Sequence, residues 1–340
     1  MRVAVLYNAV PAGASLEDQD LLVQVDTVAS TLRRLGHEAI PASCTLDLAA
    51  MRDDLLRMKP DVVFNLVESL AEADSLVYLP HAVLDALGIP YAGNRTESLF
   101  LTTHKLLAKE RLRSDGLPTP AWLDCSVSFD CSVSLAPPSC SSCPSWKKEK
   151  PSWIIKGVWD QASRGMDDDA VMREADVAEV RLRLQQRVEQ SGSPCFAEQF
   201  VEGREFNLSV LTGPNGPEVL PPAEIDFSAF PPGKPRIVGH RAKWQEDSFE
   251  FNNTPRRFDF PDAEGPLVAE LRAIVRRCWT LFRLRGWARV DFRVDAAGRP
   301  WILEINANPC LSPDAGFAAA LDRAGIPFDK AIRRILAEAK

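Results

Sequence analysis

The chain has 340 residues, which is long enough for two or three domains at the usual size of about 100–200 residues each. Its net charge of −7 and the lack of a long basic run argue against a nucleic-acid-binding protein, and no apolar stretch approaches the roughly 20 residues of a membrane helix. The apolar stretch Arg2–Tyr7 is too short for a signal peptide and fits a first strand. We therefore expect a cytoplasmic protein without a membrane or nucleic-acid partner.

Strands and helices alternate over residues 1–95. Apolar periodicity predicts strands at 2–7, 38–41 and 61–67, and helices at 16–35, at 46–58 and in the stretch that ends at Leu87. This βαβ rhythm predicts a small parallel sheet that is covered on both faces. Binding groups of such sheets lie at the carboxyl ends of the strands, which here carry Asn8 and Glu68.

The next part of the chain is interrupted by an irregular segment. A helix is expected at 103–114 and an extended stretch at 119–123, and then residues 124–151 are rich in Cys, Ser and Pro. Cys140 and Cys143 have the spacing of half a zinc site, but no second pair or nearby histidine follows, so we expect neither a zinc site nor a disulfide there. Beyond it we expect a strand at 153–156, a Gly-containing loop at 161–166, a helix at 176–190 and a strand at 194–201.

The last part combines strands with long helices. We expect a strand at 205–211, short strands around 219–227 and 236–243, a helix at 263–284, and closing helices at 313–324 and 328–339. Between them, residues 289–294 and 301–306 alternate strictly around a polar turn, which predicts a β-hairpin.

The hairpin carries the most informative side chains of the sequence. A register that pairs Val294 with Arg299 sets Arg289 opposite Glu304 and Asp291 opposite Ile302. One face then carries Arg289, Asp291, Glu304 and Asn306, and the other carries Val290, Phe292, Val294, Leu303 and Ile305. Two carboxylates and an amide oxygen are ligands that Mg²⁺ prefers. The alternative is a solvated ladder of surface charges.

Other polar groups lie at the ends of apolar strands. Lys156 precedes the loop at 161–166 and could bind a phosphate, although the loop lacks the P-loop spacing and a lysine at a strand end is often only solvated. Residues 198–201 could bind an adenine edge or be a plain half-buried strand. The cations of 240–243 could close over phosphates or lie on the surface. No G-x-S-x-G motif supports serine-hydrolase chemistry.

The order and spacing of these parts resemble the ATP-grasp superfamily, and within it the D-alanine–D-alanine ligase-like group. The motifs that carry the resemblance are Leu87–Gly93, Thr103–Lys105, Gly116–Pro118, Ile154–Lys156, Phe196–Phe206, Gly286–Asp291 and Leu303–Pro309. The resemblance implies a mixed α/β and α+β fold, in which a small parallel α/β domain precedes the two-subdomain ATP-grasp fold. We expect this first domain at 1–95, a central subdomain at 96–201 that contains the irregular segment 124–151, and a C-terminal subdomain at 202–340 with the Mg²⁺ and phosphate site.

The resemblance also implies cofactors and roles for individual residues. The implied cofactors are ATP and two Mg²⁺ ions, with Mn²⁺ as an alternative ion. Asp291, Glu304 and Asn306 match the metal ligands, and Arg289 and Lys243 match cations at the reacting phosphate. The expected nucleotide contacts are Lys105, Lys156, Ser163, Glu198, Gln199, Phe200, Val201, Glu205 and Ile302.

The segments that would bind the other substrates depart from the D-alanine ligase pattern. A His-Gly pair after the third strand is replaced by Val67–Asp74, and a Glu-containing loop by residues 9–20, where Glu17 and Asp18 could stand in. Candidate substrate contacts are Glu68, Ser312 and Asp314. We therefore predict an ATP-dependent carboxylate–amine ligase that forms an amide through an acyl phosphate. Its carboxylate would be an amino acid or similar molecule, in a reaction other than the joining of two D-alanines.

Three alternatives stay open at this point. The chain could be a D-alanine–D-alanine ligase itself, a nucleotide-binding protein without ligase activity, or a ligase that joins carboxylates to thiols or stops at the acyl phosphate. The full set of metal-binding side chains favours an enzyme over a simple binder. The resemblance further implies a homodimer that forms through the N-terminal domain.

Overall fold

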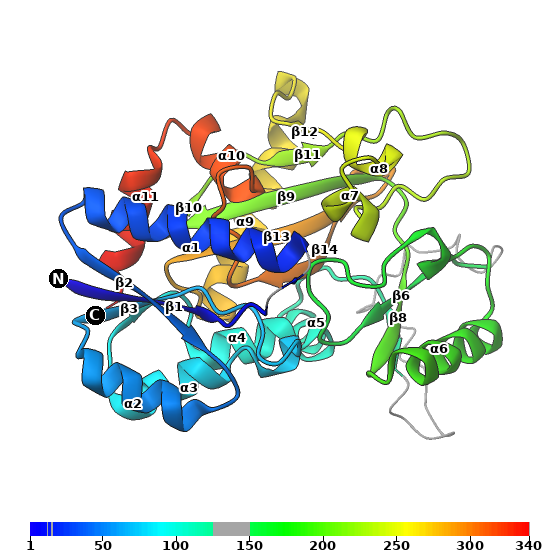
Figure 1. Cartoon of the computed structure of the whole chain (residues 1–340). Helices are drawn as coiled ribbons and strands as arrows, with labels where there is room; N and C mark the ends of the chain where they lie inside the picture. Colours follow the sequence, from blue (N-terminus) through cyan, green and yellow to red (C-terminus); the bar gives the residue numbers. More distant parts are fainter. Residues whose placement is uncertain (12, 15, 125–149, 340) are drawn as a thin grey trace.

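The computed structural model describes residues 1–340 except 12, 15, 125–149 and 340 (Figure 1). The Cys-rich part of the irregular segment therefore lies outside the described residues, and so do the side chains of Glu17 and Asp18. Three sheets organise the rest of the chain. Among the described residues, no helix is long and apolar enough to cross a membrane.

The N-terminal sheet is parallel, as the βαβ pattern predicts. Its strands β1 (Arg2–Asn8), β2 (Glu38–Cys44), β3 (Val62–Asn65) and β4 (Tyr91–Ala92) lie in the order β2-β1-β3-β4. Helix α1 (Leu16–Arg34) covers one face, and α2 (Leu48–Met58) and α3 (Leu79–Leu87) cover the other. A short 3₁₀ helix, η1 (Asp74–Leu76), precedes α3.

Alternate residues of β1 explain why helices are needed on both faces. Val3 and Val5 pack with α1, whereas Ala4 and Leu6 pack with α2 and α3. All four side chains are at most 1% exposed. The carboxyl ends of β1 and β3 consequently reach the same edge of the sheet, where Asn8 accepts a hydrogen bond from the backbone N–H of Glu68 at 3.1 Å.

A second, antiparallel sheet forms the middle of the chain. It contains β5 (Trp122–Asp124), β6 (Trp153–Gly157), β7 (Val171–Met172) and β8 (Cys195–Gln199) in the order β5-β8-β6-β7, with the 3₁₀ helix η2 (Asp168–Ala170) before β7. Helix α6 (Val177–Ser191) packs on this sheet through Val180 and Leu184. Asp176 and Glu179 form a capping box that fixes the start of the helix.

The largest sheet lies in the C-terminal part. Its strands are β9 (Arg204–Leu211), β10 (Glu218–Val219), β11 (Ala223–Ile225), β12 (Arg256–Arg257), β13 (Trp287–Val294) and β14 (Pro300–Asn306). Their order is β12-β11-β9-β13-β14, and β10 pairs with β9. The 3₁₀ helix η3 (Asp262–Glu264) leads into α9 (Gly265–Leu281), which packs on one face of the sheet. These three sheets give the predicted mixed α/β fold.

Helices from other parts of the chain complete the cores of these sheets (Figure 1). Helices α4 (Thr96–Thr103) and α5 (Lys105–Ser114) pack with α9 against the large sheet. Helices α10 (Gly316–Arg323) and α11 (Phe328–Ala337) pack against α1 and the parallel sheet. The predicted helix at 103–114 begins only at Lys105, because His104 caps α5 by accepting a hydrogen bond from Leu107 N–H.

The predicted strand around 236–243 is wrong. Residues His240–Trp244 form a short helix, α7, and Phe249–Asn252 form another, α8. The apolar stretch that suggested a strand packs elsewhere, since Ile237 lies with Ile154 and Phe200 against the middle sheet. Burial of this side chain, rather than strand pairing, explains the pattern.

Candidate active site

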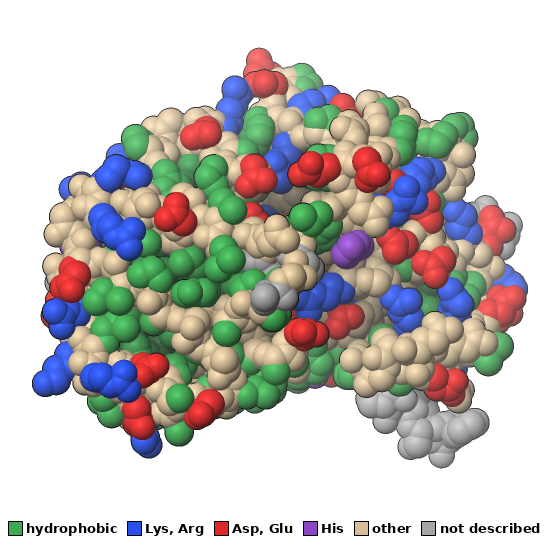
Figure 2. All heavy atoms as spheres, in the orientation of Figure 1, with side chains coloured by type: hydrophobic (Ala, Val, Ile, Leu, Met, Phe, Trp, Pro, Cys, Tyr) green, Lys and Arg blue, Asp and Glu red, His purple; other side chains and the backbone are tan. Residues whose placement is uncertain are grey.

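A cleft of about 910 Å³ opens between the middle sheet, the large sheet and the N-terminal part. Figure 2 shows this face of the molecule hollowed near its centre, with basic and acidic side chains around the hollow. The cleft brings together most of the residues that the sequence singles out. These are Glu68, Lys105, Lys156, Ser163, Glu198, Gln199, Phe200, Val201, Glu205, Lys243, Arg289, Asp291, Glu304, Asn306 and Asp314.

The hairpin of β13 and β14 forms one wall of the cleft, but in a different register from the one predicted. Asp291 pairs with Glu304 and Arg289 with Asn306, and the register shifts between Asp291 and Phe292. Leu303 is the extra residue of this β-bulge. The predicted polar face is correct despite the shift. All four of its residues lie on the side of the bulge away from the turn, so they stay in register with one another.

The bulge reverses the expected positions of two neighbouring apolar residues. Ile302 pairs with Phe292 and is fully buried in the core of the large sheet, whereas Leu303 lines the cleft. The prediction that Leu303 lies on the core face is therefore wrong. Ile302, expected to contact the nucleotide, has its side chain on the opposite side of the sheet.

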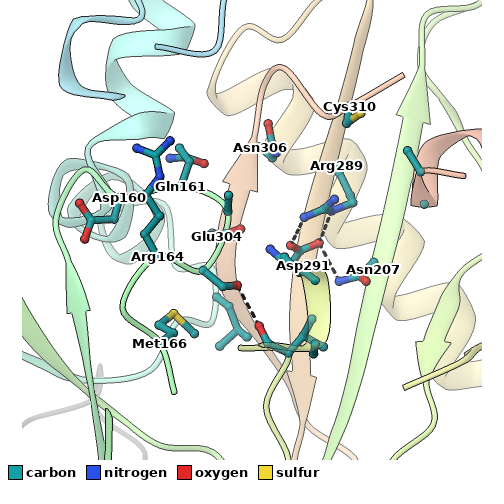
Figure 3. Close-up of a pocket in the computed structure, with 18 of the residues that line it drawn as sticks. Asp160, Gln161, Arg164, Met166, Asn207, Arg289, Asp291, Glu304, Asn306 and Cys310 are labelled. Carbon is teal, nitrogen blue, oxygen red and sulfur yellow. Dashed lines mark hydrogen bonds and ion pairs between the residues drawn. The ribbon is translucent and has the colours of Figure 1, made fainter. Parts of the chain in front are cut away.

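Arg289 and Asp291 form a two-pronged ion pair at the centre of the wall (Figure 3). Arg289 donates from Nε and Nη2 to the two carboxylate oxygens of Asp291, each at 2.7 Å. Asn207 of β9, opposite Asp291 in the sheet, donates to the same carboxylate at 2.9 Å. Burial opposes the charged form of Arg289, but attraction to Asp291 and Glu304 outweighs it and raises the pKa of the guanidinium.

Glu304 lies among cations that come from three parts of the chain. Its carboxylate is 3.9 Å from the Lys105 ammonium of α5. Burial would raise its pKa, but the charges of Lys105, Lys243 and Arg289 outweigh burial and lower the pKa of Glu304 to about 2. The carboxylate is therefore ionised throughout the physiological range, and the excess of cations around it favours an anionic ligand.

The donor atoms of Asp291, Glu304 and Asn306 fit a hard divalent cation. Among the described residues, no three His, Cys, Asp or Glu side chains gather closely enough to hold a metal ion by themselves. This wall instead offers two carboxylates and the amide of Asn306, whose Oδ1 accepts a hydrogen bond from Asn308 N–H at 2.9 Å. Mg²⁺ is often held in this way, by one or two carboxylates with phosphate oxygens and water completing its ligands.

A buried ion triad forms the opposite wall. Glu198 is 1% exposed and accepts hydrogen bonds from Lys156 and Lys109, each at 2.6 Å. Lys109 also donates to Thr119 at 2.7 Å, and Thr119 donates to the carbonyl of Ile302, so the triad joins the middle sheet to the hairpin. Burial lowers the pKa of Lys109 to about 8, even though Glu198 favours its charged form.

Glu205 is fixed by a second buried arginine. The carboxylate lies 3.1 Å from Arg293, which is 3% exposed and also donates to the backbone carbonyl of Gly203. The ring of Phe200 faces the same guanidinium, with 5.4 Å between its centroid and Cζ. Burial raises the pKa of Glu205, although Arg293 opposes the shift. Arg293, by binding Glu205 and the Gly203 carbonyl, holds the connection between β8 and β9 in place.

Loop 161–166 and helix α7 close the cleft from a third side. Ser163 lines the cleft and donates to the carbonyl of Val238 at 2.8 Å. Trp244 of α7 donates from Nε1 to the carbonyl of Ala162 at 3.3 Å. Lys243 lies on the same short helix, and burial with the nearby charge of Arg289 lowers the pKa of its ammonium. The loop and α7 therefore hold Ser163 and Lys243 on the same cleft.

Comparison with known proteins shows which family and which relatives this chain resembles. The family described as D-ala D-ala ligase C-terminus matches residues 176–337, the part that contains the hairpin. The D-alanine–D-alanine ligase of Gloeobacter violaceus is 28% identical over 99% of this chain and 98% of its own. That of Moorella thermoacetica is 29% identical over 95% of each.

A solved structure shares the fold of this chain. The crystal structure of the Bacillus anthracis D-alanine–D-alanine ligase complexed with ATP superposes with a TM-score of 0.71 at 20% identity, covering 100% of this chain and 97% of the other. The chain is thus similar to D-alanine–D-alanine ligases over nearly its whole length, and it shares their overall fold.

Within this ligase-like fold, one end of the cleft is lined by acidic side chains and a thiol. Gln24 of α1 donates to the carboxylate of Glu68 at 2.8 Å, and its carbonyl oxygen accepts from Leu311 N–H at 2.9 Å. The Cys310 thiol donates to Asp20 at 3.1 Å, and its pKa is raised by burial and by the carboxylates of Glu68 and Asp20. Of the predicted substrate contacts, Glu68 and Asp314 line this end, whereas Ser312 is fully buried outside the lining.

Sequence reasoning missed several groups of this ligase-like site. Asn207 could have been found, because the alternation of β9 sets it on the same face as Glu205. Lys109 and Arg293 read as ordinary surface charges in a helix and a strand. Only the folded chain brings Lys109 to Glu198, 89 residues away.

Proposed function

We propose that this protein is an ATP-dependent carboxylate–amine ligase, which forms an amide bond and releases ADP and phosphate. Relatives that span nearly the whole chain include several D-alanine–D-alanine ligases. The observation that carries the proposal is the convergence of Lys105, Lys243 and Arg289 with the carboxylates of Asp291 and Glu304 in a single cleft. Such a set can bind a triphosphate and offset the charge that moves during phosphoryl transfer.

ATP is proposed to lie between the middle and large sheets. The backbone of Glu198–Val201 would bind the adenine edge, since the carboxylate of Glu198 is already occupied by two lysines. Glu205 would bind the ribose, and Lys105, Lys156 and Ser163 the phosphates. Asp291, Glu304 and Asn306 would hold two Mg²⁺ ions, or Mn²⁺ in their place. When bound, these ions would neutralise charge on the phosphate oxygens.

The side chains of the chain itself account for most of the proposed chemistry. A carboxylate becomes reactive when the γ-phosphoryl group is transferred to it, and the amine then attacks the acyl carbon and displaces phosphate. Arg289 stays charged and is held rigidly by Asp291, so it can stabilise the acyl phosphate oxygens and then the oxyanion. Lys243, on α7, would bind the phosphates from the other side and help to exclude water.

The substrate is proposed to be an amino acid or an amino-acid-like carboxylate, with an amine as the second substrate. Glu68 and Asp314 lie at the end of the cleft where these molecules would bind. D-Alanine–D-alanine ligation itself is the second candidate, and the names of the relatives favour it. The departure of residues 67–74 and 9–20 from the pattern of the D-alanine ligases favours other substrates.

Further parts of the proposal rest on the resemblance and on the reaction. We propose a homodimer through the N-terminal domain, and a cytoplasmic location because the reaction consumes ATP. The division into units at 1–95, 96–201 and 202–340 is likewise proposed; each contains one of the three sheets, although α4, α5, α10 and α11 pack across these bounds.

The proposal is tested by phosphate release. Purified protein is incubated with ATP and Mg²⁺, with pools of amino acids and then with single carboxylates and amines. Release that requires both a carboxylate and an amine supports the ligase. Hydroxylamine added in place of the amine should trap the acyl phosphate as a hydroxamate. Nucleotide binding without phosphate release across broad pools would instead indicate a nucleotide-binding protein without ligase activity, and preference for thiols would indicate a different ligase class.

A further inference from the structure

Loop 161–166 has an unfavourable backbone conformation at its centre. Ala162 and Ser163 follow each other in the left-handed region, with φ of 55° and 62°. Side-chain-bearing residues rarely adopt this region, and they keep it where surrounding contacts over-determine it, often at functional sites. The contacts that hold this loop are therefore informative about its role.

One side of the loop is held by the carboxylate of Asp74, which belongs to the N-terminal part of the chain. Asp74 is 6% exposed. Its carboxylate accepts a hydrogen bond from Gln161 N–H at 2.8 Å and forms an ion pair with Arg164 at 3.1 Å. These two partners flank Ala162 and Ser163 on either side. A single carboxylate thus fixes both ends of the left-handed pair.

The other side of the loop is held by the segment that leads into α7. Val238 and Trp244 make the two hydrogen bonds described above, and the backbone N–H of His240 donates to the carbonyl of Met166 at 3.0 Å. Figure 3 shows Gln161, Arg164 and Met166 along this loop, with the Arg164 guanidinium close to Gln161 and away from Met166. Arg187 of α6 also donates to the carbonyl of Gly165, so Asp74 is one of several groups that hold the loop, and the one that holds both residues flanking the left-handed pair.

We propose that Asp74 is a positioning residue for the triphosphate of the nucleotide, acting through loop 161–166. By holding Gln161 and Arg164, it keeps Ser163 directed into the cleft. Asp74 ends the segment Val67–Asp74, which also carries Glu68 at the far end of the cleft. The contact therefore makes triphosphate binding depend on the part of the chain that lines the substrate end. This inference rests on the proposed function, since it requires that the cleft binds ATP.

The test compares two ligands in the full-length protein. Binding of a non-hydrolysable ATP analogue with Mg²⁺, and of adenosine alone, is measured by calorimetry for the wild type, Asp74→Asn, Arg164→Gln and the double variant. The matched control is Glu72→Gln, which removes an exposed carboxylate from the same segment. We expect each single variant to bind the analogue about tenfold more weakly, as the loss of a charged hydrogen bond would give. Adenosine should bind with unchanged affinity.

The double variant separates a shared contact from two independent effects. If Asp74 acts through Arg164, the losses in affinity of the two single variants should not add. The double variant should then bind the analogue about as weakly as the single variant with the lower affinity. Asp74→Asn should also make the loop more sensitive to trypsin after Arg164. If Asp74→Asn does not fold, the partly exposed Arg164→Gln, with a side chain that is 34% exposed, carries the test.

Three results would overturn the inference. Unchanged binding of the analogue by Asp74→Asn would show that the loop does not need this carboxylate. An equal loss for analogue and adenosine would indicate general damage to the fold. Failure of the wild type to bind any nucleotide would remove the proposed function together with this inference, whereas the first two results would leave the proposed function intact.

Discussion

Replacing Glu304 by Gln separates the proposed metal-binding role of this carboxylate from its contribution to stability. The substitution keeps the size of the side chain and removes its charge. In the native protein Lys105, Lys243 and Arg289 surround that charge, and Asp291 is its partner across the hairpin. We expect Glu304→Gln to lose nearly all turnover while it stays folded.

The size of both effects follows from the site. If this carboxylate binds the metal as proposed, its loss should remove at least about 2.7 kcal/mol of transition-state stabilisation, which is about 100-fold in turnover. The folded-state pKa of Glu304 is about 2, against an ordinary value of 4.5, which corresponds to a contribution on the order of 3 kcal/mol to stability. Because the side chain is 27% exposed, screening reduces this value, and we expect a measured loss of about 2 kcal/mol.

The pH dependence has a defined sign. Since folding lowers the pKa of Glu304, its contribution is present above the ordinary value of 4.5 and is lost as the pH falls toward 2. The difference in unfolding free energy between the wild type and Glu304→Gln should therefore be full at pH 7 and smaller at pH 3. Urea unfolding at both pH values measures it, and phosphate release measures turnover, with Glu72→Gln as the control. A variant that keeps more than a tenth of the wild-type turnover would refute the metal assignment.

Three further substitutions test other parts of the site. Lys109→Met breaks the buried triad around Glu198 and should lower the free energy of unfolding, measured in urea, by about 3 kcal/mol. The control is Arg111→Met, on the exposed side of α5. A loss below about 1 kcal/mol for Lys109→Met would contradict the buried-charge argument. Arg289→Lys keeps the charge but cannot form the two-pronged pair with Asp291, so turnover at saturating ATP should fall about 100-fold while the fold persists. Turnover at the wild-type rate would show that the planar geometry of the guanidinium is unimportant. Gly239→Ala would set a Cβ 2.3 Å from the Met166 carbonyl oxygen, so it should displace α7 from loop 161–166. We expect the binding of an ATP analogue to weaken about tenfold. Unchanged affinity would mean that this contact does not contribute to nucleotide binding.

The sequence predicts those features of the fold that depend on local periodicity. Alternation fixes the strands of the parallel sheet and the polar face of the hairpin, because side chains repeat every second residue whatever the partner strand. The bulge at Leu303 is not visible in the sequence, since Ile302 and Leu303 are both apolar and either could face the core. The helical turn of α7 is too short for periodicity to detect, and Ile237 beside it imitates a strand.

Contacts between distant parts of the chain define the rest of the site. Lys109 and Glu198, or Asp74 and Arg164, are ordinary charged residues until the fold brings them together. Their burial forces them to pair, and this pairing fixes the walls of the cleft. Sequence pattern therefore finds the residues proposed to act on the ligand, and the structure adds those that hold them in place.

The central claim is that the hairpin holds a divalent ion and with it the triphosphate of ATP. The most direct measurement is a crystal structure of the protein with a non-hydrolysable ATP analogue and Mg²⁺. We expect the adenine beside Glu198–Val201, and at least one ion bound by oxygens of Asp291, Glu304 and the phosphates. A nucleotide bound elsewhere, or phosphates in the cleft with no ion at these carboxylates, would contradict the account.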